Sequence, residues 1–164
     1  MTTDLHRERI DAVLHEIRRS GAQCVVDLGC GNGALGIKAA QLNPDAELLF
    51  VDESYAAIAS ARLNFTSAFP GRKAEFLVSD GLTDVTPASA GLVLCNPPFH
   101  QQQAVGDEMA KRLFAQSREA LDAEGSLMVV GNRHLGYHVK LRTNFDKVEQ
   151  LSANPKFVVL KASS

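Results

Sequence analysis

The sequence predicts an α/β fold in which a seven-stranded, mostly parallel sheet carries helices on both faces. Short apolar runs typical of buried strands alternate with helical patterns along the chain, starting with the run Cys24 to Leu28. Alternation of this kind is typical of parallel strands joined by crossover helices. In addition, glycine-rich or polar motifs directly follow several of the predicted strands. Ligands of such sheets bind beyond the carboxyl ends of the strands, so these motifs predict one shared site.

The predicted elements follow one another in a regular order. Residues 1–20 form an N-terminal amphipathic helix with apolar residues at helical spacing, and residues 21–164 form the core. The helices are predicted at residues 4–19, 34–42, 54–65, 108–121 and 135–142, and the strands at residues 24–28, 47–51, 75–78, 91–95, 127–130, 147–151 and 156–160. Ser54 suits the N-cap of its helix, and Asn154 with Pro155 suits the turn between the last two strands.

Length and composition bound the class of protein. A chain of 164 residues suits one domain, so residues 1–164 are predicted to form a single one. Its 45% hydrophobic and 22% charged residues are ordinary for a soluble globular protein, and no apolar run is long enough to span a bilayer. The N-terminus lacks the apolar segment of a signal peptide, which predicts a cytoplasmic protein without a membrane partner. The net charge of −2 gives no indication of nucleic-acid binding, and nothing indicates the oligomeric state.

The three cysteines do not indicate a metal or disulfide site. Cys24, Cys30 and Cys95 include no C-x-x-C pair, and their number is odd. We expect them to be small buried side chains in a reducing compartment.

A glycine-rich turn, residues 27–33, directly follows the first predicted strand and opens a helix. Such a turn can be purely structural, but its context indicates nucleotide binding. A dinucleotide site prefers G-x-G-x-x-G, with the pyrophosphate at the helix N-terminus. Here the spacing is G-x-G-x-G, and Asp27 stands two residues before the first glycine, where its carboxylate would repel a pyrophosphate. The carboxylate suits a ligand with a sulfonium and an amino group, which favours S-adenosylmethionine over NAD. The candidate cofactor residues of this turn are Asp27, Gly29, Cys30, Gly31, Asn32 and Gly33.

Acidic residues at the ends of the next two strands extend the candidate cofactor site. Asp52 follows the second strand, with Glu53 beside it, and a carboxylate there can accept hydrogen bonds from both hydroxyls of a ribose. The segment 27–33 closely resembles motif I of class I methyltransferases, which have a Rossmann-like fold. In those families an acid after the third strand receives the adenine amino group, and the resemblance implies this role for Asp80, which precedes Gly81. From residue types alone, Asp80 is equally compatible with a solvated turn.

The segment Asn96-Pro97-Pro98-Phe99 follows the fourth strand, which is expected to lie beside the first. Proline lacks an N–H and holds the preceding residue extended, so the segment presents the Asn96 side-chain oxygen and the Pro97 carbonyl as two fixed acceptors. Two such acceptors can orient a planar amine so that its lone pair faces a methyl donor. Phe99 offers a flat surface on which a flipped base can stack. A simple proline turn with a core phenylalanine is the alternative, and the position after a strand of this fold disfavours it. The motif resembles that of amino-methyltransferases, which act on the amines of adenine or guanine or on glutamine amides. It therefore predicts a catalytic site for such a reaction, and Asn96 is also expected to touch the cofactor.

The resemblance becomes narrower over residues 24–162. The segments that carry it are Val51 to Ser54, Asn96 to Gln102, Asn132 to Leu135 and Asn154 to Lys161. Together they resemble the catalytic domain of the ribosomal RNA guanine-N2 methyltransferases, above all the members that act on the large subunit. This resemblance implies S-adenosylmethionine as cofactor, guanine N2 as methyl acceptor, and ribosomal RNA, protein-free or partly assembled, as partner.

Two features depart from this resemblance. Those enzymes carry a second, degenerate methyltransferase-like domain before the catalytic one, and the predicted single domain does not include it. Residues 1–20 are instead similar to the helix before motif I in bacterial small-RNA 2′-O-methyltransferases, whose metal-binding histidine and glutamate cluster is not found here. Two other functions therefore stay open: a methyltransferase for another planar amine, such as adenine N6 or protein glutamine, and a cofactor-binding module that is inactive without a separate RNA-binding domain.

A basic stretch near the catalytic motif is the candidate RNA contact. Residues 131–147 hold Arg133 and Lys140 among four basic residues, against a single acid. We expect Arg133 and Lys140 to contact phosphate, with a solvated helix face as the alternative. His100, next to the catalytic motif, is assigned to substrate binding. The histidines of this region lack the spacing of metal ligands, so no metal is predicted.

Overall fold

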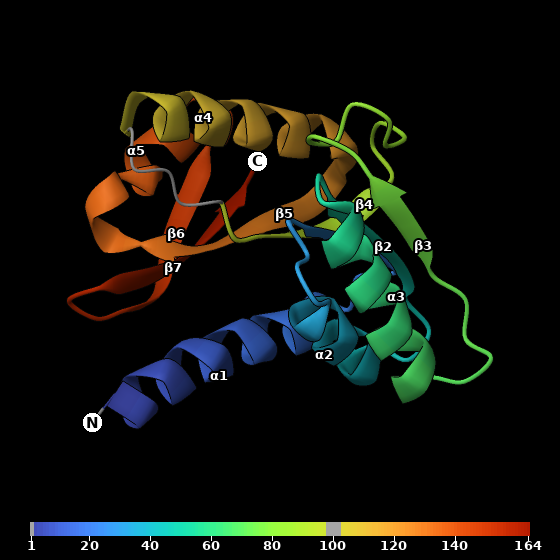
Figure 1. Ribbon diagram of the computed structural model, residues 1–164. Helices are drawn as coiled ribbons and strands as arrows, with labels where there is room; N and C mark the ends of the chain where they lie inside the picture. Colours follow the sequence, from blue (N-terminus) through green and yellow to red (C-terminus); the bar gives the residue numbers. More distant parts are fainter. Residues whose placement is uncertain (1, 98–102) are drawn as a thin grey trace.

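The computed structural model describes residues 2–97 and 103–164, and it confirms the predicted sheet of seven strands. The strands are β1 (Cys24–Leu28), β2 (Glu47–Asp52), β3 (Glu75–Val78), β4 (Ala90–Cys95), β5 (Leu121–Asn132), β6 (Lys147–Ala153) and β7 (Phe157–Ser163). Their order in the sheet is β3-β2-β1-β4-β5-β7-β6 (Figure 1). The first five strands are parallel, and β7 runs antiparallel to both of its neighbours. The strand order reverses between β1 and β4, and ligands of such sheets bind at this point.

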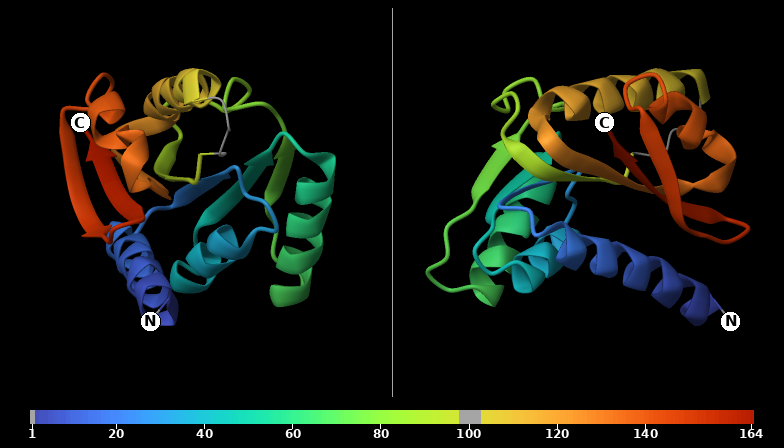
Figure 2. Two further views of the ribbon diagram at one scale, coloured as in Figure 1. Left: turned by 60° about the vertical axis from the view of Figure 1, so that its left-hand side comes forward. Right: turned by 180° about the vertical axis from the view of Figure 1, so that it is seen from behind.

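Helices cover both faces of the sheet, as predicted. Figure 2 shows α1 (Thr2–Ser20), α2 (Ala34–Leu42) and α3 (Tyr55–Ala68) on one face, and α4 (Gln103–Ala120) and α5 (Tyr137–Leu141) on the other. Each face has its own apolar core, because alternate residues of a strand point to opposite sides. Ile17 and Phe65 anchor the first core, and Phe114 and Leu141 anchor the second.

The largest differences from the prediction lie in three elements. The helix α4 begins at Gln103 rather than at Glu108. Its first turn includes a glycine, and the apolar residues Ala104 and Val105 are exposed, so this turn does not continue the apolar spacing of the later turns. The strand β5 runs from Leu121 to Asn132 rather than over residues 127–130, because Leu121 already pairs with Ala90 of β4 and the second half of the strand pairs with β7 throughout. The helix predicted over 135–142 is split into a 3₁₀ turn, η1 (Arg133–Leu135), and α5, since Gly136 between them has φ 65°.

Other local expectations are met. Ser54 caps α3, and its Oγ accepts a hydrogen bond from the Ala57 N–H at 3.2 Å. The three cysteines carry free thiols, and Cys30 and Cys95 are buried as expected, whereas Cys24 is only half-buried. Within the described parts of the chain, none of the helices has the length and apolar character needed to cross a membrane.

Candidate active site

A pocket of about 210 Å³ opens at the carboxyl ends of β1 to β4. The strand ends contribute Leu28, Gly29, Asp52, Glu53, Ser79, Asp80, Gly81, Cys95 and Asn96 to its lining, and α4 contributes Met109 and Leu113. Residues from four separate motifs of the sequence therefore share one pocket. A larger hollow at the amino ends of β1 to β3 contains none of these motif residues.

A buried carboxylate on β1, that of Asp27, stabilises the glycine turn from the interior of the protein. Asp27 is 4% exposed, and its Oδ2 accepts a hydrogen bond from the Gly36 N–H at 2.9 Å in the first turn of α2. A Cβ at Gly36 would lie 2.4 Å from the Phe50 ring, so only glycine fits there. Burial raises the pKa of Asp27 to about 7, although the hydrogen bond from the Gly36 N–H acts in the opposite direction and lowers it. Asp27 thus shapes the turn from inside, and its contact with a cofactor stays a prediction.

Within the turn, the predicted residues play different local roles. Gly31 has φ 54° and donates its N–H to Asp52 Oδ2 at 3.0 Å. Asn32 Oδ1 accepts the Ala34 N–H at 3.0 Å, which supports the start of α2. Gly33 has φ 83° at the N-cap of α2. Burial, followed by the nearby Asp27 and Asp52, raises the pKa of the Cys30 thiol to about 12, so this thiol stays protonated and unreactive.

The two strand-end acids, Asp52 and Asp80, lie in the same pocket. Asp52 uses both oxygens for backbone N–H groups, with Oδ1 accepting from Ser54 at 2.9 Å. Glu53 beside it is exposed. Asp80 is paired with Arg112 of α4 at 2.7 and 3.0 Å, and these hydrogen bonds lower the pKa of Asp80.

The sequence predicts Arg112 on a helix but indicates no role for it. The partner Asp80 lies far away in sequence, and no local pattern indicates the pair. The weak signal that was present is the apolar spacing of Met109 and Leu113, which orients α4 toward the pocket and brings Arg112 to its rim.

Asn96 stands directly beside the glycine turn. The pairing of β1 with β4 puts Leu28 opposite Cys95, so Gly29 and Asn96 follow at the same level. A Cβ at Gly29 would lie 3.5 Å from the Asn96 carbonyl oxygen. Asn96 is exposed and Pro97 is half-buried. Pro98, Phe99 and His100, which the sequence assigned to catalysis and substrate binding, lie outside the described residues.

The two predicted phosphate contacts differ in their surroundings. Arg133 is exposed and donates to the Asn154 carbonyl oxygen at 3.5 Å. The Lys140 ammonium is instead engaged within the protein: it lies 2.9 Å from Asp107 Oδ1 and donates to the Leu135 carbonyl oxygen. Lys140 therefore connects α5 to the first turns of α4, which the sequence did not indicate.

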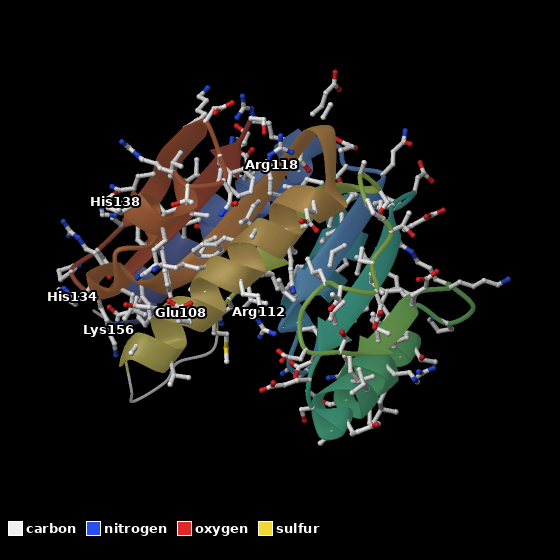
Figure 3. All side chains as sticks on the ribbon, turned by 90° about the horizontal axis from the view of Figure 1, so that it is seen from above. Glu108, Arg112, Arg118, His134, His138 and Lys156 are labelled. Carbon is white, nitrogen blue, oxygen red and sulfur yellow. The ribbon has the colours of Figure 1, made fainter. Side chains whose placement is uncertain are left out.

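A basic groove lies between α5 and the β6–β7 pair. Its lining consists of Arg133, Tyr137, His138, Arg142, Val148, Gln150, Val158 and Leu160, without an acidic residue among them. Figure 3 shows His134, His138 and Lys156 at the same end of the molecule as the start of α4, which carries Glu108. Among the described residues, no group of His, Cys, Asp and Glu side chains is arranged to hold a metal ion.

Comparison with known proteins identifies close relatives. Over 148 residues, or 90% of this chain, the sequence is 60% identical to the ribosomal RNA large subunit methyltransferase G of Pseudomonas paraeruginosa and 56% identical to that of Pseudomonas putida. The chain spans 40% of the length of these relatives.

Solved structures show the same fold. A T. thermophilus 16S rRNA N2 methyltransferase in complex with AdoMet and guanosine has a TM-score of 0.76 and 27% identity, over 95% of this chain and 42% of that chain. Human N-acetylserotonin methyltransferase in complex with SAM has a TM-score of 0.69 at 18% identity, over 94% of this chain and 51% of that chain. These similarities confirm the predicted Rossmann-like fold of class I methyltransferases.

The match to a known family covers most of the domain. Residues 10–161 match the family described as the methyltransferase small domain, a range that includes β1 to β6, most of β7 and all the residues that line the pocket. The chain therefore belongs to the methyltransferase small-domain family.

Proposed function

We propose that this domain transfers the methyl group of S-adenosylmethionine to the exocyclic N2 amine of a guanine in ribosomal RNA. The observation that carries the proposal is the position of Asn96, which is exposed at the end of β4, beside Gly29 and in the pocket that Asp52 and Asp80 share. The names of the relatives, ribosomal RNA large subunit methyltransferase G and a 16S rRNA N2 methyltransferase, support the choice of substrate.

The residues of the pocket fit the proposed cofactor. Asp52 and Asp80 supply carboxylates for ribose hydroxyls and an adenine amino group, and Met109 and Leu113 supply an apolar wall for the ring. Each carboxylate oxygen has a second lone pair, so the hydrogen bonds that Asp52 already accepts do not prevent it from binding hydroxyls. When bound, S-adenosylmethionine supplies an electrophilic methyl group on a sulfonium.

Asn96 and Pro97 perform the orientation of the substrate in this proposal. The Asn96 side-chain oxygen and the Pro97 carbonyl accept the two N–H groups of the guanine amine, which turns its delocalised lone pair toward the methyl group. In this orientation the nitrogen lone pair would form the new bond to the methyl carbon, and the neutral thioether S-adenosylhomocysteine would leave with the electron pair of the broken carbon–sulfur bond. The methylated nitrogen then carries a positive charge and releases a proton to water, so no strong base is needed. The high pKa of the neighbouring Cys95 thiol, raised to about 12 first by burial, agrees with a passive role for that side chain.

The basic groove is the proposed RNA contact. Arg133, His138 and Arg142 line it without an opposing acid, so a phosphodiester backbone can be neutralised there. Lys140 contributes indirectly, because its pairing with Asp107 fixes α5 at one wall of the groove. The partner is ribosomal RNA in the cytoplasm, protein-free or partly assembled.

A methyl-transfer assay separates this proposal from its alternatives. The protein is incubated with labelled S-adenosylmethionine and, in parallel, with protein-free ribosomal RNA, partly assembled ribosomal particles, transfer RNA and a protein extract. We expect N2-methylguanosine in ribosomal RNA, identified by nucleoside mass spectrometry. Methylated adenine or glutamine would replace the proposed substrate. Cofactor binding without transfer to any acceptor would favour the second candidate, a module that needs the part of its relatives that this chain does not span.

A further inference from the structure

Two polar side chains of α4, one helical turn apart, hold the loop that follows β3. Arg112 donates to both oxygens of Asp80, at 2.7 and 3.0 Å. Gln116 Oε1 accepts the backbone N–H of Leu82 at 2.9 Å. Because residues four apart lie on the same face of a helix, Arg112 and Gln116 act on the loop together. We call this pair the α4 clamp.

The clamp fits closely against the loop. Gly81, between the two clamped residues, is buried and has φ +96°. A Cβ at Gly81 would lie 2.2 Å from Gln116 Oε1, so the loop backbone lies directly on the Gln116 side chain. The position of Asp80 relative to the pocket is therefore set by α4 as well as by the end of β3.

The clamp also orders the charges at the pocket. The pKa of the Arg112 guanidinium is raised, first by its hydrogen bonds to Asp80 and less strongly by the charge of Glu53. Both of these acids line the pocket, so Arg112 contributes a positive charge beside its acidic edge. A bidentate guanidinium occupies one lone pair on each carboxylate oxygen and fixes the plane of the carboxylate. The remaining lone pairs of Asp80 are free to accept another N–H group.

The helix that carries the clamp also forms the apolar wall of the same pocket, through Met109 and Leu113. In Figure 3 Arg112 points from α4 toward the ends of the strands, whereas Arg118 lies farther along the helix. The helix α4 thus supplies both an apolar surface against which a flat ring can pack and the side chain that binds the Asp80 carboxylate.

We propose that Arg112 and Gln116 are positioning residues that make the cofactor pocket selective for adenine, by holding the Asp80 carboxylate in the plane and direction that accept the 6-amino group. This inference rests on the proposed function, because it takes S-adenosylmethionine as the cofactor.

The test compares two ligands that differ only at this edge of the base. Binding of S-adenosylhomocysteine is measured by calorimetry against its inosine analogue, which has a carbonyl oxygen in place of the amino group. A carbonyl facing a carboxylate is repelled, so the wild-type protein is expected to prefer the adenine compound by about tenfold or more. Arg112→Gln and Gln116→Ala are expected to reduce this preference to about threefold or less, mainly through weaker binding of the adenine compound. Arg112→Lys keeps the positive charge but cannot donate two parallel hydrogen bonds to the carboxylate, so an intermediate preference for the adenine compound is expected.

Arg118→Gln is the matched control, because it removes the same charge from the same helix away from the pocket. Circular dichroism and thermal melts check that each variant is folded. An unchanged preference in both Arg112→Gln and Gln116→Ala would overturn the inference, as would an equal loss of affinity for both ligands, which is the result of a purely structural role. If the wild-type protein binds neither ligand, the proposed function itself is wrong.

Discussion

Asp52 joins the end of β2 to the glycine turn after β1, because its Oδ2 accepts the Gly31 N–H at 3.0 Å. Its other oxygen accepts the Ser54 N–H at 2.9 Å, at the cap of α3. One carboxylate therefore orders two neighbouring backbone segments of the same pocket. A ligand that binds Asp52 consequently meets a preformed surface rather than a flexible one.

Replacement of Asp52 should weaken cofactor binding. Asp52→Ala removes a charged hydrogen-bond acceptor, and the expected loss is about 1–3 kcal/mol of binding free energy for S-adenosylmethionine, measured by calorimetry. Asp45→Ala is the control, since Asp45 is exposed in the turn before β2, at the other edge of the sheet. Wild-type affinity in Asp52→Ala, or tight NADH binding without any response to S-adenosylhomocysteine, would contradict the assignment of the cofactor site.

The buried Asp27 should give the fold a characteristic pH dependence. Its pKa is about 7 in the folded protein, raised by burial, and about 3.9 in an unfolded chain. The folded state therefore binds more protons between about pH 4 and pH 7, so the free energy of unfolding falls as pH rises through this window, by up to about 1.4 kcal/mol for each unit of difference in pKa. Asp27→Asn has no charge to lose and keeps an acceptor for the Gly36 N–H. Urea unfolding at about pH 5 and pH 8 should show a larger fall for the wild type than for Asp27→Asn, and parallel changes in the two proteins would rule this account out.

A nearly buried ion pair should hold α1 on the sheet. Glu16 has a side chain 4% exposed, and its Oε1 lies 2.5 Å from the Lys161 ammonium on β7. Lys161→Met leaves Glu16 paired with Arg19, whose Nη1 lies 3.4 Å from Oε2, and the expected loss is about 1–3 kcal/mol of unfolding free energy in urea. The double variant Glu16→Gln with Lys161→Met removes both charges and should recover part of that loss. If the double variant is no more stable than the single one, the pair does not act as described.

The basic groove should determine the salt dependence of RNA binding. Each phosphate contact contributes about 0.7–0.9 to the slope of log affinity against log salt concentration. Arg133→Glu and Arg142→Glu should each flatten this slope, measured with ribosomal RNA fragments by fluorescence anisotropy. Lys147→Glu makes the same charge change on β6, where Lys147 pairs with Glu149 outside the groove. An equal slope in all of these variants would place the RNA on another surface.

The first half of the sheet could be predicted closely from the sequence. The strands β1 and β2 and the helix between them have the predicted positions almost residue for residue, because their apolar runs are bounded by glycine and proline signals. The sequence also predicted that the glycine turn, Asp52 and Asn96 meet, since parallel strands bring their carboxyl ends to one edge of the sheet, whereas Asp80 was added by the resemblance to methyltransferases. Gly29 of the turn, Asp52, Asp80 and Asn96 do line one pocket.

The contacts that the sequence did not reveal join residues far apart in the chain. From the sequence, Lys140 is indistinguishable from a free basic residue. In the structure, the packing of α4 places Asp107 beside it. From the sequence, Arg112 is indistinguishable from a solvated helix residue. In the structure, the loop after β3 places Asp80 within hydrogen-bond distance of it. Pairing of this kind depends on how two elements pack against each other, so neither the apolar spacing of the sequence nor a local motif can predict it.

In the proposed reaction Asn96 orients the amine that is methylated, and the variant Asn96→Ala removes this group. Methyl transfer to ribosomal RNA is measured for the wild type, Asn96→Ala and Asn96→Asp, together with the affinity for S-adenosylmethionine. Loss of a positioned polar group typically lowers the rate by about 10²–10³, so Asn96→Ala should lose transfer by that factor while cofactor affinity stays near the wild-type value. Asn96→Asp keeps an acceptor in nearly the same place and should retain measurable activity. Wild-type turnover in Asn96→Ala would contradict the account, because the segment after β4 would then be only a structural turn.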